Sequence, residues 1–179
     1  MRKNVFIFIC FLGFSSIFSV LFYNMTNFYI FLVLSISFCT TFYHFIYRFI
    51  IAAFLDVSHN KKLYKFYVYN NFWFKEKKYE KKIYKILKVK IWKHKVPTWS
   101  PESFSLKNHS KEELVLSTCQ AEFIHEVNCI LSFIPIIASI PFGKFWVFFF
   151  TSLFSAIFEL IFVIVQRFNR PRLLNLIKN

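Results

Sequence analysis

Residues 5–23 read VFIFICFLGFSSIFSVLFY and contain no charged side chain. A helix rises about 1.5 Å per residue, so about 20 apolar residues cross the hydrocarbon core of a bilayer. The run is longer than the apolar part of a cleaved signal peptide, about 7–15 residues, and no small-residue cleavage site follows Tyr23. We therefore predict an uncleaved first transmembrane helix.

Three further apolar runs follow along the chain, and they are Phe28–Leu55, Val127–Ile140 and Phe145–Val165. The first of these has the length of a span, and the last carries a single charge, that of Glu159. The run in between reaches span length only if its helix begins near Phe123. We predict an all-α fold, a multi-span helical bundle of about four transmembrane helices.

Charge is separated from these runs. The 179 residues are 56% hydrophobic, yet the formal net charge is +14. Between Lys61 and Lys111 there are 15 Lys and 3 Glu, and more cations lie near both ends. Since Lys and Arg gather on the cytoplasmic side of a membrane, both termini and the middle segment are predicted to be cytoplasmic.

One integrated membrane domain follows from this order. Its predicted parts are transmembrane helices 1 and 2 in 1–57, a basic interfacial segment in 58–110, transmembrane helices 3 and 4 in 111–166, and a basic tail in 167–179.

The basic segment alternates lysines with large apolar side chains between Lys61 and Lys95. Five of the apolar side chains fall near one helical face: Phe72, Tyr79, Ile83, Ile86 and Leu87. This pattern predicts a basic amphipathic helix on an anionic membrane surface. A short strand around Val89 and a solvated loop are the alternatives. Nucleic acid is not an expected partner, because the segment is tethered to a membrane.

A helix start is encoded by Ser110 and Glu113, which form a capping box. The helix is expected to run from Lys111 toward Ile134, where Pro135 bends or ends it. Residues three or four apart on a helix are neighbours, so Glu122, His125 and Glu126 share one side.

A carboxylate beside an imidazole is typical of general-base chemistry at an alcohol. The alternative is that these polar residues only decorate the helix where it enters the interface. A metal site is not expected, because Glu-x-x-His occurs once and a two-iron bundle needs it twice. Glu159 lies about 9 Å below the inner end of its span, and ionisable groups at such depth are candidate functional residues.

Three segments carry a family resemblance when taken together. They are WKHK at 92–95, AEFIH at 121–125 and VQRFNRPRL at 165–173. In this order and spacing the chain resembles the glycosyl-4,4'-diaponeurosporenoate acyltransferase family, which completes staphyloxanthin-type carotenoids. The resemblance covers roughly Tyr64–Leu176.

The resemblance implies a multi-pass bacterial cell-membrane enzyme that moves a fatty acyl group onto a hydroxyl of a glycosylated carotenoid or related glycolipid. Acyl-CoA, acyl-carrier protein or a lipid is the expected acyl donor, with no cofactor or metal. We infer that His125 is the base, oriented by Glu122, with His94 in reserve. The expected substrate-binding residues are Trp92, Gln166, Arg167, Asn169, Arg170 and Arg172.

Two alternatives stay open from the residues. One is a non-catalytic accessory protein that binds anionic lipids through the basic segment. The other is a different lipid-modifying enzyme, such as a methyltransferase or reductase. That enzyme needs a nucleotide cofactor, and Gly13 and Gly143 do not make a glycine-rich phosphate loop.

Overall fold

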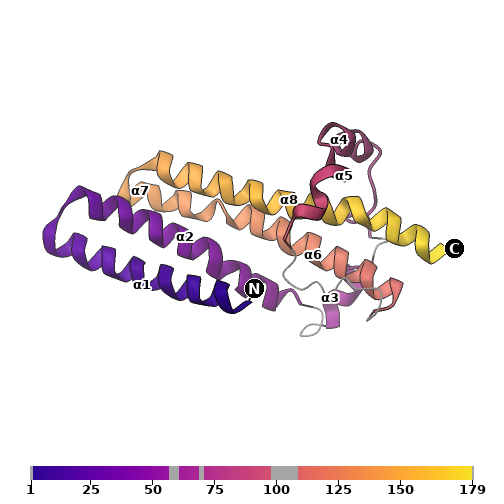
Figure 1. The fold of residues 1–179 in the computed structure, drawn as a ribbon, viewed down its shortest axis with the longest axis horizontal. Coiled ribbons are helices and arrows are strands. Elements are labelled where there is room, and N and C mark those ends of the chain that lie inside the picture. The colour runs from indigo at the N-terminus through magenta and orange to yellow at the C-terminus, as the bar shows by residue number, and fades with distance from the viewer. Residues whose placement is uncertain (1, 57–60, 69–70, 98–108, 179) are drawn as a thin grey trace. The chain divides into compact units, whose positions relative to one another are not determined.

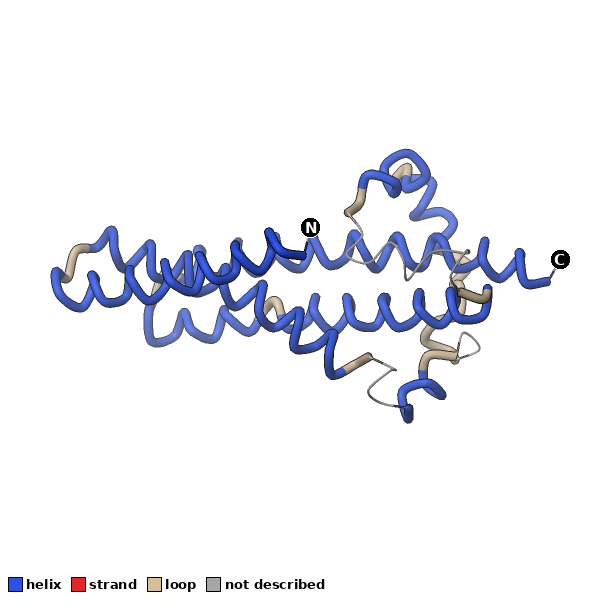
Figure 2. The backbone as a smooth tube through the Cα atoms, turned by 60° about the horizontal axis from the view of Figure 1, so that its bottom comes forward, coloured by secondary structure: helices blue, strands red, loops and turns tan. Residues whose placement is uncertain are grey.

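The computed structural model describes residues 2–56, 61–68, 71–97 and 109–178, and every regular element in those ranges is a helix (Figure 2). The long helices are α1 (Arg2–Thr26), α2 (Tyr29–Phe54), α6 (Lys111–Leu131) and α8 (Phe145–Lys178). The short ones are α3 (Lys61–Phe66), α4 (Glu80–Ile86), α5 (Val89–Trp92) and α7 (Ser139–Phe142), with the 3-10 turns η1 (Lys93–Lys95) and η3 (Ile134–Ala138). The all-α prediction is confirmed.

Four helical stretches are long and apolar enough to cross a bilayer, as predicted. They are Lys3–Thr26, Tyr29–Phe54, Lys111–Phe142 and Phe145–Leu176. The chain forms two compact units, one of residues 1–51 and 128–157, the other of residues 52–127 and 158–179.

In the first unit α1 and α2 lie side by side (Figure 1). Aromatic pairs join them at both ends: the ring centroids of Phe8 and Phe45 are 5.3 Å apart, as are those of Phe22 and Phe31. Such edge-on and tilted contacts are the favoured geometries of aromatic pairs. The phenylalanine-rich sequence therefore holds this hairpin together by ring packing.

Pro135 explains how α6 ends within the first unit. Because proline has no N–H, it leaves the carbonyl of Leu131, four residues earlier, without its helical donor. The hydroxyl of Tyr43 on α2 donates to that carbonyl at 3.0 Å. The hydroxyl of Tyr47 donates to the carbonyl of Asn128, also at 3.0 Å. The Asn128 carbonyl also accepts from the Ser132 amide at 2.9 Å, so it is the Leu131 carbonyl that depends on a side chain. In an apolar medium each backbone polar group must be satisfied, so Tyr43 makes the break in the helix tolerable.

The second unit packs α6 against the C-terminal part of α8 around a small aromatic core. The buried residues of that core are Tyr67, Phe74, Val115 and Cys119. The capping box at the start of α6 is confirmed in both directions. The Glu113 amide donates to Ser110 Oγ at 3.1 Å, and the Ser110 amide donates to the Glu113 carboxylate at 2.9 Å.

The basic segment, for which a basic amphipathic helix was predicted, does not form a single helix, because local turns divide it into α3, α4, α5 and η1. The side chain of Asn71 donates to the Phe66 carbonyl and accepts from the Trp73 amide, each at 3.1 Å, which favours a turn. Lys88 adopts φ 51°, a left-handed conformation that separates α4 from α5. The strand considered around Val89 is helical, as part of α5.

Candidate functional site

His125 forms a hydrogen-bonded pair with a carboxylate from another helix of the second unit. Its Nδ1 lies 2.6 Å from Oε2 of Glu159 on α8. The imidazole also stacks on the Phe162 ring, with centroids 4.6 Å apart and planes inclined by 11°. The side chain of Glu159 is 1% exposed, whereas that of His125 is 24% exposed. A buried carboxylate therefore fixes a ring that still reaches the surface of the unit.

This pair corrects the sequence prediction that Glu122 orients His125. The carboxylate that does so is Glu159, 34 residues away in the chain. When Nδ1–H donates to Glu159, the lone pair is on Nε2, which is then the nitrogen able to accept a proton.

Glu122 instead lies between the guanidinium groups of Arg167 and Arg170 and is fully buried. We name these three residues the clamp. Its Oε1 accepts from Arg167 Nη1 at 2.5 Å, and its Oε2 accepts from Arg170 Nη2. Arg170 is 3% exposed and also donates to the carbonyl of Phe74 at 2.9 Å. A buried charge is tolerated when it is paired and hydrogen-bonded in this way.

Glu80 extends the clamp to the lysine-rich segment. Its Oε1 accepts from Arg167 Nη2 at 2.8 Å, and its Oε2 accepts from the Tyr84 hydroxyl at 2.7 Å. Burial, followed by this hydrogen bond, raises the pKa of Tyr84 above its usual value. Sequence reasoning missed Glu80, although a rare glutamate among fifteen lysines is a detectable signal. The clamp thus ties α4 to α6 and α8.

Glu126, the third polar residue on the same side of α6, joins the edge of the clamp. Its Oε2 accepts from the Trp73 indole N–H at 2.5 Å, and its Oε1 lies 3.7 Å from Arg167 Nη1. The sequence predicted that Glu122, His125 and Glu126 share one face of α6. In the structure Glu122 and Glu126 lie beside Arg167 of the clamp, whereas His125 pairs with Glu159.

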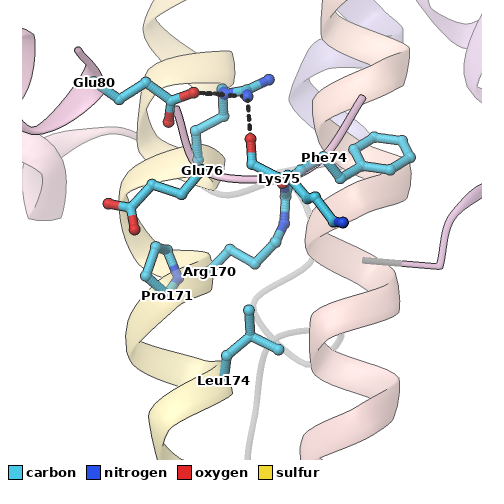
Figure 3. Close-up of a pocket in the computed structure, with 8 residues that line it drawn as sticks. Phe74, Lys75, Glu76, Glu80, Arg170, Pro171 and Leu174 are labelled. Carbon is cyan, nitrogen blue, oxygen red and sulfur yellow. Dashed lines mark hydrogen bonds and ion pairs between the residues drawn. The ribbon is translucent and has the colours of Figure 1, made fainter. Parts of the chain in front are cut away.

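A pocket of about 210 Å³ opens beside the clamp (Figure 3). The residues that line it are Phe74, Lys75, Glu76, Glu80, Arg167, Arg170, Pro171 and Leu174. Both of its guanidinium groups are engaged by carboxylates, Arg167 by Glu80 and Arg170 by Glu122. The predicted use of Arg167 and Arg170 in substrate binding is therefore not favoured by this geometry.

The WKHK segment and the C-terminal motif meet at Phe168. Lys93 Nζ donates to Asn169 Oδ1 at 2.6 Å and lies 5.0 Å from the centroid of the Phe168 ring. The Arg172 guanidinium carbon lies 4.4 Å from the same centroid. We name Lys93, Phe168, Asn169 and Arg172 the cation cluster.

The remaining predicted residues lie outside these contacts. The indole N–H of Trp92 donates to the Leu87 carbonyl at 2.8 Å, which is a structural use. His94 is exposed in η1, and Gln166 is half-buried on α8. Within the described ranges no group of three His, Cys, Asp or Glu side chains is placed to hold a metal ion.

Comparison with known proteins gives one family. A family model described as glycosyl-4,4'-diaponeurosporenoate acyltransferase matches residues 70–179, which is more than half of the chain. The matched region includes all three motif segments, the pair of His125 with Glu159, the clamp and the cation cluster. Neither a curated protein nor a solved structure matches the chain.

Proposed function

Because the chain belongs to the glycosyl-4,4'-diaponeurosporenoate acyltransferase family, we propose that this acyltransferase of carotenoid biosynthesis esterifies a sugar hydroxyl of a glycosylated carotenoid or a closely related glycolipid. The observation that carries the proposal is the pair of His125 and Glu159 within the matched region. It supplies the basic group that an alcohol acceptor needs.

In the proposed reaction the sugar oxygen attacks the carbonyl carbon of the acyl donor. Nε2 of His125 takes the hydroxyl proton as the new C–O bond forms. Glu159 stabilises the imidazolium that results, since a carboxylate on Nδ1 favours the charged ring. The bond from the carbonyl carbon to the donor's leaving group then breaks, and the imidazolium returns the proton to that group. Neither a redox step nor a cofactor is needed.

The proposed location is the cytoplasmic interface of the bacterial cell membrane. Most of the positive charge lies in the segment between α2 and α6 and near the chain ends, which supports cytoplasmic termini for a chain with four spans. The acceptor is largely apolar, so its polyene would stay in the bilayer while its sugar reaches the interface.

The test compares His125→Ala with His109→Ala in membranes that contain the glycosylated carotenoid. His109 is a matched control, because it also lies beside a glutamate, Glu113 at 3.5 Å, but is exposed. We expect His125→Ala to lose the product whose mass is one acyl group higher, with normal insertion, and His109→Ala to retain it. Full activity of His125→Ala would refute the assignment. His94→Ala tests the reserve base and should remain active.

A second role, binding of anionic lipid, is supported by the surface of α4 and α5. Large apolar side chains are exposed there beside lysines: Ile83, Ile86, Leu87 and Ile91. Ile86 and Ile91 are 68% and 63% exposed, which suits a helix lying in the headgroup region. A purely accessory protein would tolerate His125→Ala, yet lose its preference for anionic nanodiscs when Lys81 and Lys82 are replaced by Glu.

A further inference from the structure

Two cations lie against one aromatic ring in the cation cluster. Lys93 comes from η1 and Arg172 from α8, and both are held near Phe168. Each cation gains from the π-electrons of the ring, but the two positive charges repel one another. Burial and the nearby Arg172 lower the pKa of Lys93 below its ordinary value. An anion bound close to both cations would offset this repulsion.

The cluster differs from the clamp in one decisive respect. Arg167 and Arg170 are neutralised by Glu80 and Glu122. Among the described residues, neither Lys93 nor Arg172 forms an ion pair with a carboxylate. Arg172 is exposed, so its guanidinium is accessible to a ligand from solution. The cluster, rather than the clamp, has the charge and the access that an anion requires.

Asn169 adds a neutral hydrogen-bond donor to the two cations. Its Oδ1 accepts from Lys93 Nζ at 2.6 Å, which leaves its Nδ2 group as a donor beside the two cations. A lysine, a planar guanidinium and an amide together suit the several oxygens of a phosphate.

The position of the cluster along α8 restricts which phosphate compound fits. Glu159, the partner of His125, and Arg172 are thirteen residues apart on this helix. At 1.5 Å and 100° per residue this corresponds to roughly 20 Å along the helix axis and about 140° around it. In a phospholipid the acyl ester lies close to the phosphate, so a headgroup bound at the cluster would leave its ester far from the base. A pantetheine arm places a thioester at a long distance from its phosphate.

We propose that Lys93, Asn169 and Arg172 bind the phosphate of an acyl thioester donor of the coenzyme A or phosphopantetheine class. The pantetheine arm then runs along α8 and part of the way around it, and presents the thioester carbonyl near His125. The sugar oxygen forms a bond to that carbonyl carbon, the C–S bond breaks, and the thiol leaves with the proton that His125 took from the hydroxyl. This inference rests on the proposed acyl transfer and adds the donor class and a further binding residue, Lys93.

The experiment measures binding of coenzyme A to the full chain in nanodiscs by isothermal titration calorimetry. We expect Lys93→Gln and Arg172→Gln each to weaken binding about tenfold or more, since each removes a charge-assisted bond to phosphate. Lys90→Gln is the control, because Lys90 is exposed on the neighbouring α5 and undergoes the same loss of charge. Lys93→Arg retains the charge and should retain most of the affinity.

Comparison of probes identifies the source of the phosphate. 4'-Phosphopantetheine should compete with coenzyme A, whereas pantetheine, which has no phosphate, should not. If only coenzyme A binds, its nucleotide phosphates are the ligand. If phosphopantetheine competes well, the cluster binds the phosphate that coenzyme A shares with an acyl-carrier protein, and either donor fits. Both results support the proposal.

Three results would overturn it. The first is that coenzyme A fails to bind the intact protein, and the second is that pantetheine binds as well as coenzyme A. The third is that the glutamine variants bind coenzyme A normally but are no longer stabilised against unfolding by phosphatidylglycerol in the nanodisc. The last result would assign the cluster to a lipid headgroup. The proposed function fails separately, because His125→Ala is expected to bind coenzyme A normally whether or not it remains active.

Discussion

Nδ1 of His125 lies 2.6 Å from Oε2 of Glu159, and this contact joins α6 to α8 within the second unit, beside the contacts that Glu122 makes with Arg167 and Arg170. Phe162 holds the imidazole from one face, so the ring is fixed by both a hydrogen bond and a stacking contact. If His125 is the base, as proposed, a ring held in this way does not have to be ordered during the reaction, which lowers the free energy of reaching the transition state.

Replacing Glu159 by Gln should reduce kcat while leaving KM for both substrates nearly unchanged. The amide keeps the shape of the carboxylate but cannot stabilise an imidazolium. General-base contributions are about 10²- to 10⁴-fold, so we expect kcat to fall about 100-fold or more. Steady-state acyl transfer in nanodiscs measures this. Glu112→Gln provides the control, because Glu112 is exposed in the first turn of α6. Equal rates for the two variants would contradict the role of Glu159.

Glu122→Ala should destabilise the protein rather than act on the chemical step. The change leaves the buried guanidinium of Arg170 without its carboxylate and deprives Arg167 of one of its partners. Breaking a buried ion pair in this way costs about 3–5 kcal/mol. Thermal unfolding in detergent should show a much lower Tm, and the double variant Glu122→Ala with Arg170→Met should recover part of the loss. A normal Tm with lost activity would restore the catalytic role first predicted for Glu122.

Glu80→Ala should release α4 from α8. It removes the acceptor used by both Arg167 and Tyr84, so the lysines of α4 should become accessible to trypsin. Glu76→Ala is a matched control, since Glu76 makes only an exposed contact of 3.9 Å with Lys81, and such surface pairs contribute little. Limited proteolysis followed by mass spectrometry compares the two. Equal cleavage would show that Glu80 does not anchor this segment.

Binding of the phosphate donor should weaken with rising pH before an ordinary lysine loses its proton. The pKa of Lys93 is lowered by burial and by Arg172, so its positive charge is lost as the pH rises through that lowered value. Titration with desulfo-coenzyme A avoids ionisation of the thiol. Lys93→Arg should flatten the profile, because arginine stays protonated. Parallel profiles for the two proteins would exclude Lys93 from the site.

The parts predicted correctly from the sequence are those governed by local rules. The apolar runs give the spans, and Ser110 and Glu113 give the start of α6 because capping needs only residues three apart. The end of α6 follows in the same way from Pro135, which removes one backbone donor. The family match also agrees with the motif segments from which the resemblance was drawn.

The contacts between side chains within the site could not be predicted from the sequence. Whether His125 meets Glu122 or Glu159 depends on how α6 and α8 are rotated about their axes, and spacing along one helix does not determine that. Arg167 and Arg170 have the residue type of phosphate ligands, yet Glu122 uses both of them. The lysine-rich segment has a helical pattern overall, but Asn71 and Lys88 interrupt it at single residues.

The helix α8 continues for 34 residues, with Pro171 inside it, so the partner of the proposed base, the clamp arginines and the α8 residues of the cation cluster all lie on one helix. The number of residues between these groups therefore fixes their separation and their orientation about the helix axis. Adding one residue between Glu159 and Arg167 would rotate the rest of α8 by about 100° about its axis and lengthen the helix by only about 1.5 Å. Arg170 would then face away from Glu122 on α6, although every side chain of the motif is retained. In α8 the number of residues between Glu159 and the C-terminal motif therefore matters to the site as much as the identity of those residues.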